Sequence, residues 1–352
     1  MKSQSSGSAG AYPPAPGEAR PLQVVATGGG TGLSTLLKGL KRYVVGGEPA
    51  AGGRAVGGLC AVVTVTDDGG SSGRLRKEFN VLPPGDIRNC IAALSEDEAL
   101  LSRLFQHRFH TGAGLNGHSF GNLFLTALTA ITGDFAEAVK QSSEILATRG
   151  HIYPSTTSDV QLEATMADGT RVSGETNITA STQRIVEIQL RPADVQPLPQ
   201  TLEAIAQADL ITIGPGSLFT SLVPNLLVRG IPEAVAASRA VKVFVCNLMT
   251  EANESLGLSA ADHIRVLHEH AHTRIVDYAM VNRTPVPGEL KAKYAAEGGT
   301  QIEVDVAAIE KMGVKVILGD YLETAQGVAR HATDRVARDL LGLAAQAAAA
   351  GR

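Results

Sequence analysis

The sequence predicts an α/β protein with a Rossmann-like, doubly wound and mostly parallel sheet that carries an inserted antiparallel β-meander. Two observations support this fold class. Short apolar runs rich in Val, Ile and Leu alternate with segments of helical periodicity, which is the order of parallel βαβ units. From about residue 153 to 190 the period changes to two residues, in VQLEAT, RVSGET and RIVEIQL, with a turn at Asp168-Gly169.

The elements of the main sheet follow from the apolar runs and the segments between them. The predicted strands are Leu22–Thr27, Leu59–Thr66, Leu210–Ile213, Val241–Cys246, Ile275–Val281 and Val314–Leu318. The predicted helices are one carried by Leu33, Leu36, Leu37 and Leu40, others at about 86–95, 97–108, 118–132 and 134–148, and an Ala- and Leu-rich helix to about residue 349. In such sheets, ligands bind at the carboxyl ends of the strands near the switch point.

The chain is expected to form one folded domain behind a short tail. Residues 1–20 are of low complexity and are expected to be disordered. Residues 21–352 are predicted to form a single α/β domain, with the meander inserted at about 153–190. Residues 46–58 (GGEPAAGGRAVGG) are expected to be a flexible surface loop.

The composition argues against nucleic-acid binding. Hydrophobic residues make up 44% and charged residues 19%, as in globular proteins. The formal net charge is −4, aromatic residues make up 4% and Trp is absent, so the sequence lacks both a basic surface and a stacking platform. We therefore expect no nucleic-acid partner, and any anionic ligand must be held by local donors.

The cysteines and the apolar runs bear on the cellular compartment. Cys60, Cys90 and Cys246 lie far apart in apolar stretches and are expected to be buried free thiols, which fits a reducing compartment. The N-terminal segment lacks the apolar stretch of a signal peptide, and no apolar run reaches the roughly 18–20 residues of a membrane helix. The sequence thus predicts a cytoplasmic protein that does not enter a membrane.

A glycine-rich loop follows the first predicted strand and opens a helix. It consists of Gly28, Gly29, Gly30, Thr31 and Gly32. Glycines let a phosphate approach the backbone amides, and the helix start adds N–H groups and a partial positive charge. A dinucleotide fingerprint fails because Leu33 stands where a third small residue belongs, and a P-loop fails because Lys38 comes too late. We interpret the loop as a phosphate site, with a tight turn as the alternative.

Asp67 and Asp68 end the second predicted strand and precede a loop rich in glycine and serine. Two adjacent carboxylates at a sheet edge are unfavourable unless a cation, a hydroxyl group or an arginine meets them. Beside a phosphate site they suggest a site for Mg²⁺, which shares oxygen ligands with phosphates. Ribose binding, or ion pairs with Arg74, Arg76 or Arg88, are the alternatives.

Two further segments add polar residues to the same cleft. In PPGDIRN, Asp86 is placed as a helix cap or first-turn acid, and Arg88 and Asn89 follow it. In GHSFGN, His118 and Asn122 are four residues apart and so share one face of a helix. We predict that Arg88, Asn89, His118 and Asn122 contact the ligand. Structural capping is the alternative for Asp86, and capping or a surface position for His118.

The loop Gly214-Pro215-Gly216-Ser217 repeats the logic of the first loop, since it joins a strand to a helix. Gly214, Gly216 and Ser217 are predicted to bind phosphate at the helix start, with Thr220 and Ser221 as further hydroxyl donors. An N-cap serine is the alternative interpretation of Ser217.

Three histidines near residue 270 resemble metal ligands but are not predicted to be a metal site. In a helix only His268 and His272 share a face, and His270 does not join them. We expect a solvated helix end there. No Ser/His/Asp or Cys/His set can be assembled from the sequence, so no catalytic residue is assigned.

Several long blocks of the sequence resemble one family. GGGTGLSTLLKGL, VTVTDDGGSSGRLR, PPGDIRN, GHSFGN, ADLITIGPGSLFTSLVPNLLV and NLMT, in this order, are similar to the gluconeogenesis factor family. This is the YvcK-like branch of the superfamily that includes 2-phospho-L-lactate transferase, and the resemblance spans roughly residues 22–340. It implies a CofD-like Rossmann fold, binding of UDP-sugars such as UDP-N-acetylglucosamine, and a role in cell morphogenesis and wall synthesis during gluconeogenic growth.

The resemblance also implies a ligand cleft. It contains Gly29–Gly32, Asp67, Asp68, Asn89, Asn122 and Gly214–Ser217. One segment departs from the family, in which QPGET and a tyrosine are usual: this chain has Glu251-Ala252-Asn253-Glu254-Ser255, with Leu258 at the tyrosine position. The phosphate end is thus expected to be intact, while the base end is expected to differ.

Two classes of function follow from these residues. The first is a regulatory UDP-sugar-binding protein without turnover, and the alternative is a Mg²⁺-dependent transferase of the 2-phospho-L-lactate type. Both are compatible with Asp67 and Asp68, and the sequence offers no evident general base. Mg²⁺ is the only cofactor considered, and no tightly bound organic cofactor is expected. A homo-oligomer and an unidentified regulatory protein partner are compatible with either class.

Overall fold

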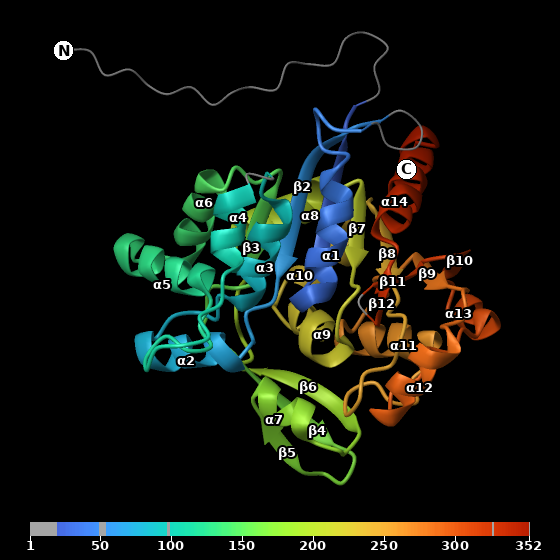
Figure 1. Cartoon of the computed structure of the whole chain (residues 1–352). Coiled ribbons are helices and arrows are strands. Elements are labelled where there is room, and N and C mark those ends of the chain that lie inside the picture. The colour runs from blue at the N-terminus through green and yellow to red at the C-terminus, as the bar shows by residue number, and fades with distance from the viewer. Residues whose placement is uncertain (1–19, 49–53, 97–98, 326, 352) are drawn as a thin grey trace.

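A computed structural model of the chain describes residues 20–48, 54–96, 99–325 and 327–351 (Figure 1). The predicted tail therefore lies outside the described residues except for Arg20, whose guanidinium pairs with the carboxylate of Asp209. No helix in this described part is both long and apolar enough to cross a membrane.

A seven-stranded parallel sheet forms the centre of the molecule, in the order β10-β9-β8-β7-β1-β2-β3. Its strands are β1 Leu22–Gly28, β2 Val56–Val63, β3 His151–Pro154, β7 Leu210–Ile213, β8 Val241–Val245, β9 Tyr278–Asn282 and β10 Lys315–Gly319. The chain adds strands outward on one side from β1 to β3 and on the other side from β7 to β10. The switch point therefore lies between β1 and β7, which confirms the doubly wound fold.

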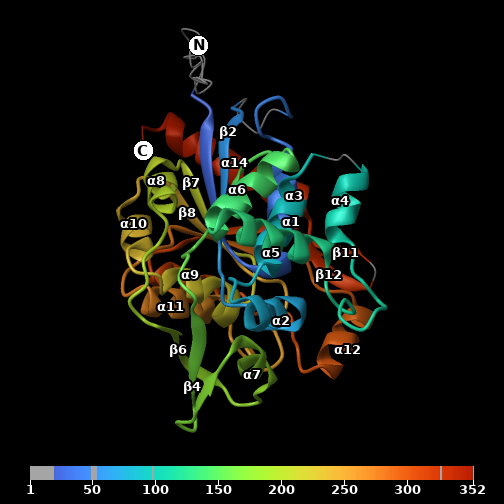
Figure 2. The same ribbon diagram turned by 90° about the vertical axis from the view of Figure 1, so that its left-hand side faces the viewer.

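The central strands are mostly apolar because helices cover both faces of the sheet. All four residues of β7 are buried. Figures 1 and 2 show one group of helices side by side on one face and a second group on the other. The first group is α1 Gly30–Lys41, α3 Gly85–Leu94 and α14 Thr333–Ala349, and the second is α8 Pro199–Gln207 and α10 Ile231–Ala237. In α1 the predicted leucine stripe is buried against the sheet.

Besides α3, the chain between β2 and β3 forms three more of the predicted helices and one that was not predicted. The helices are α2 Gly70–Phe79, α4 Ala99–Gln106, α5 Phe120–Thr132 and α6 Phe135–Ile145. The helix α2 was not predicted, because its segment begins with glycine and serine and Leu75 is its one buried apolar side chain. Residues 97–98, predicted to be helical, lie outside the described part.

The inserted antiparallel sheet differs from a meander in its strand order. Its strands β4 Gln161–Met166, β5 Arg171–Ser173 and β6 Ile185–Arg191 lie in the order β5-β4-β6. Gly174 (φ 89°) ends β5, and the short helix α7 Glu175–Ala180 returns the chain to the other edge of β4. Tyr153, predicted to open the insertion, belongs to β3 of the main sheet. The inserted sheet projects beyond the carboxyl ends of the parallel strands (Figure 1).

Two other regions were predicted incorrectly. β2 begins at Val56, inside the segment expected to be a loop. This start was not predicted because Gly57 and Gly58 follow Val56, and glycine is unfavourable in strands. Near the C-terminus an unpredicted hairpin of β11 Leu322–Ala325 and β12 Val328–His331 packs near α12 Gly288–Ala296. The remaining helices are the π-helix η1 Leu218–Leu222, α9 Val223–Leu226, α11 Ala260–His270 and α13 Val306–Lys311. The three cysteines are buried free thiols, as predicted.

Candidate functional site

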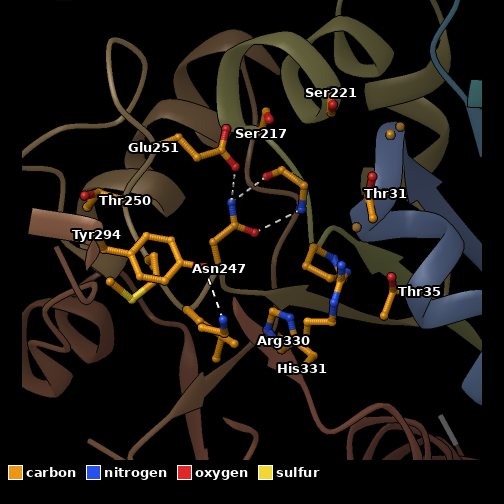
Figure 3. A pocket seen from close by; sticks show the side chains of 18 residues that line it. Thr31, Thr35, Ser217, Ser221, Asn247, Thr250, Glu251, Tyr294, Arg330 and His331 are labelled. Atoms are coloured by element: carbon orange, nitrogen blue, oxygen red, sulfur yellow. Dashed lines mark hydrogen bonds between the residues drawn. The ribbon is translucent and has the colours of Figure 1, made fainter. Parts of the chain in front are cut away.

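A pocket of about 400 Å³ opens at the switch point, between the loop from β1 to α1 and the loop from β7 to η1 (Figure 3). The first loop contributes Gly29, Gly30, Thr31, Gly32 and Thr35 of α1, and the second contributes Pro215, Gly216, Ser217 and Ser221 of η1. Two predicted phosphate loops, distant in sequence, therefore line one pocket.

The two loops touch each other because glycine occupies position 32. A Cβ atom at Gly32 would lie 2.3 Å from the carbonyl oxygen of Pro215, which real Cβ atoms do not approach. A Cβ atom at Gly29 would likewise lie 2.6 Å from Thr64 and 2.8 Å from the carboxylate of Asp86. Gly32 thus allows the two backbones to pack closely, and Gly29 allows the side chains of Thr64 and Asp86 to approach the first loop.

Asn247, which follows β8, fixes the second loop. Its side-chain oxygen accepts a hydrogen bond from the Gly216 amide at 3.0 Å, and its side-chain nitrogen donates to the Gly216 carbonyl at 2.9 Å. The same nitrogen lies 3.3 Å from Oε1 of Glu251, which also lines the pocket. The amide of Gly216, predicted to bind phosphate, is therefore engaged within the protein.

The start of η1 is also occupied from within. Oε1 of Glu254 accepts hydrogen bonds from the amides of Phe219 at 2.7 Å and Thr220 at 3.0 Å. Burial and the charge of Glu251 raise the pKa of Glu254 to about 8. The carboxyl group of Glu254 thus occupies the position beside Thr220 that was predicted to bind phosphate. The side chains of Ser217 and Ser221 still line the pocket.

The third wall comes from C-terminal residues that the sequence analysis missed. Tyr294 of α12 lies across the pocket from Thr31 and Thr35 (Figure 3), and its hydroxyl accepts a hydrogen bond from the Ala329 amide at 3.2 Å. Arg330, exposed on β12, adds a cation to the pocket lining. No local motif marks either residue, because they reach the pocket only through the packing of α12 against the hairpin.

Two further residues, His331 and Leu258, add no charge to the pocket. His331 lines the pocket, but its Nε2 lies 3.0 Å from the Cys246 carbonyl, and burial lowers its pKa to about 4. The ring is therefore neutral at pH 7. Leu258, which stands at the expected tyrosine position, packs against the main hydrophobic core and does not line the pocket.

Asp67 and Asp68 point in different directions. Asp67 Oδ1 accepts a hydrogen bond from the Gly69 amide at 2.9 Å. Asp68 Oδ1 accepts hydrogen bonds from the amide of Thr176 at 2.8 Å and from its hydroxyl at 2.7 Å, at the start of α7. Among the described residues, no three His, Cys, Asp or Glu side chains converge as ligands of a metal ion. Asp67 and Asp68 therefore do not form a preformed pair of metal ligands in this structure.

Asp86 connects this acidic region with the pocket. As one of the two predicted positions has it, Asp86 lies in the first turn of its own helix, α3, and its carboxyl accepts a hydrogen bond from the Gly30 backbone at the start of α1. Burial and the charge of Asp67 raise the pKa of Asp86 to about 7. The same two causes raise the pKa of Glu175, on α7, to about 9. Like charges therefore accumulate behind the first loop, and a bound cation would relieve them.

The remaining predicted contacts, Arg88, Asn89, His118 and Asn122, do not line the pocket, and neither do Gly28 and Gly214. Ser71 Oγ is 2.9 Å from His118 Nδ1 and accepts a hydrogen bond from the Asn122 side chain at 3.1 Å, and all three residues are buried. Arg88 donates a hydrogen bond to the side chain of Asn89 at 2.7 Å. The histidines near residue 270 are no metal site either: Nε2 of His270 accepts a hydrogen bond from the Ile188 amide of β6.

Comparison with known proteins places this geometry in a family. The family model of 2-phospho-L-lactate transferase CofD matches residues 24–322. The chain is 47% identical over 316 residues to the gluconeogenesis factor of Bacillus subtilis, covering 90% of this chain and 96% of that protein. It is 46% identical to the gluconeogenesis factor of Halalkalibacterium halodurans, covering 90% and 95% respectively. A crystal structure of a protein from Bacillus halodurans matches with a TM-score of 0.87 at 45% identity, covering 92% of this chain and all of that one.

The raised pKa of Glu175 predicts a pH-dependent stability. Because the folded-state pKa is about 9 against an ordinary value of 4.5, this carboxyl stabilises the fold at low pH and loses that contribution as the pH rises between these values. Glu175→Gln removes the loss. We expect the variant to be more stable than the wild type by about 1–2 kcal/mol at pH 8 and by much less at pH 5.

The measurement is urea denaturation at both pH values without divalent cations. Glu187→Gln, which changes an exposed glutamate on β6, is the matched control and should show no difference. An equal effect of Glu175→Gln at both pH values would contradict the assignment of a raised pKa.

Proposed function

The chain belongs to the family of 2-phospho-L-lactate transferase CofD, and we propose that it is a regulatory protein that binds UDP-sugars, such as UDP-N-acetylglucosamine, at the switch-point pocket. The observation behind this proposal is the combination, in one pocket, of two glycine-rich loops with an aromatic ring opposite them. Relatives named gluconeogenesis factor support a role linked to gluconeogenic growth. We extend the proposal to cell morphogenesis and wall synthesis.

The phosphates fit the side of the pocket formed by α1 and η1. Asp86 engages the Gly30 amide, and Thr31 and Gly32 follow it in the first turn of α1, where the helix dipole favours an anion. The hydroxyls of Thr35 and Ser217 add donors beside them. Since Glu254 and Asn247 already engage the amides of the second loop, we assign the main phosphate contacts to the first loop.

The base fits the opposite end, against the ring of Tyr294. The ring is half-buried and is held in place by the Ala329 amide. Stacking on an aromatic ring contributes roughly 1–3 kcal/mol for a base. The pocket volume of about 400 Å³ lies within the range of ordinary ligand sites. Tyr294 would thus supply the aromatic contact that Leu258 cannot.

A Mg²⁺-dependent transferase is the second candidate, and the acidic region favours it. Asp67 and Asp86 fit a bound Mg²⁺, because their like charges adjoin the first loop and a cation would relieve them. Asp68 is engaged with Thr176. When bound there, Mg²⁺ would neutralise charge on phosphate oxygens. We favour regulation over turnover because Ser71 and His118, a hydroxyl and an imidazole in hydrogen-bond contact, are buried and do not line the pocket.

Loss of the contact between the loops tests the phosphate site. Gly32→Ala places a methyl group against the Pro215 carbonyl and separates the two loops. We expect the wild type to bind UDP-N-acetylglucosamine and Gly32→Ala to bind it at least tenfold more weakly, measured by isothermal titration calorimetry. Gly114→Ala, at a glycine with open space around it, is the control and should bind normally. Wild-type affinity in Gly32→Ala would place the ligand elsewhere.

The ring of Tyr294 provides a test of the base end. Tyr294→Ala removes the stacking surface, so UDP-N-acetylglucosamine should bind roughly ten- to hundredfold more weakly. Tyr294→Phe keeps the ring and loses only the hydroxyl that meets Ala329, so its affinity should fall much less. Calorimetric titrations of both variants decide the matter. Equal losses in the two variants would show that the hydroxyl, rather than stacking, matters.

The regulatory function predicts binding without consumption. After prolonged incubation of UDP-N-acetylglucosamine with the protein and Mg²⁺, with and without a deazaflavin acceptor, chromatography should recover the ligand intact. Transfer chemistry requires a second substrate held in line with the first and activated. Release of UDP or UMP that disappears in Asp67→Asn would instead support the transferase.

A further inference from the structure

Glu251 is an acceptor-only group in a pocket otherwise suited to phosphate. It lies on the pocket lining, within hydrogen-bond reach of Asn247, which in turn holds both backbone groups of Gly216. The side chain of Asn247 therefore links the Glu251 carboxylate to the second glycine-rich loop. Arg330, the cation of the pocket, lies on the other side of Asn247 (Figure 3).

The charge of Glu251 is not balanced by its partners. Its side chain meets the amide of Asn247 and the carboxyl of Glu254, and neither is a cation. The positive start of η1 is occupied by Glu254, which accepts both amides there. Glu254 is buried at the start of η1, whereas the carboxylate of Glu251 lies at the pocket.

A carboxylate in this position discriminates between ligands. It can accept hydrogen bonds from sugar hydroxyls or an amide N–H, but it repels additional phosphate charge in a partly desolvated site. We propose that Glu251 is a specificity-determining residue that favours nucleoside diphosphates esterified to a sugar over nucleotides with a free terminal phosphate. This inference rests on the proposed function and concerns the class of nucleotide that the pocket accepts.

Glu251→Gln tests the inference, since it removes the charge and keeps an oxygen for the Asn247 amide. Calorimetric titrations with UDP-N-acetylglucosamine, UDP and UTP, at fixed ionic strength and without divalent cations, give the preference for the sugar ester. We expect the variant to bind UDP and UTP at least tenfold more tightly than the wild type does. Its affinity for UDP-N-acetylglucosamine should change less than threefold.

Glu297→Gln, on the exposed end of α12, changes the net charge equally and should leave the preference unchanged. Glu251→Asp, which withdraws the charge by one methylene, should give an intermediate preference and serves if the glutamine variant does not fold. An unchanged preference in Glu251→Gln, or an equal change in Glu297→Gln, would overturn the inference. A wild type that binds UTP as tightly as the sugar ester would overturn it and leave the proposed function standing, whereas a wild type that binds neither would overturn both.

Discussion

The contact of Gly32 with the Pro215 carbonyl is the constraint on which the pocket depends. β1 and β7 are neighbours in the sheet, so the loops that follow them must emerge side by side. Only a residue without a side chain lets α1 begin so close to the second loop. The pocket forms because two neighbouring parallel strands lead into two loops whose backbones lie in contact.

Carboxylates from elsewhere in the chain meet three of the helix starts around this centre. Asp86 accepts from Gly30 at α1, Glu254 from Phe219 and Thr220 at η1, and Asp68 from Thr176 at α7. Each contact satisfies amides that would otherwise lack partners. The protein thus places its own carboxyl groups at helix starts suited to ligand anions, and a phosphate must use the donors that remain. Burial raises the pKa of Asp86 and of Glu254, although the hydrogen bonds from these amides act in the opposite direction.

The sequence predicted the sheet well where burial determines the residue type. The strand Leu210–Ile213 was placed with its correct bounds because all four of its residues are buried and three of them are apolar. Both glycine-rich loops were expected in one cleft because each follows a strand and because the family resemblance implies it, and the pairing of β1 with β7 brings them together. Tyr294 and Arg330 were missed because tertiary packing alone brings them there. Glu254 was noticed only as a departure from a family pattern, since its role depends on a helix start more than thirty residues away.

The three cysteines make this chain a suitable background for site-specific labelling. All are buried, and burial raises the pKa of Cys60 and of Cys246 to about 12, so their thiolates are scarce at neutral pH. A cysteine introduced at an exposed position such as Ala252, one residue beyond Glu251, would react with a maleimide dye ahead of the native thiols. Fluorescence from that position would report directly on the segment beside the pocket, without removal of any native residue from the core.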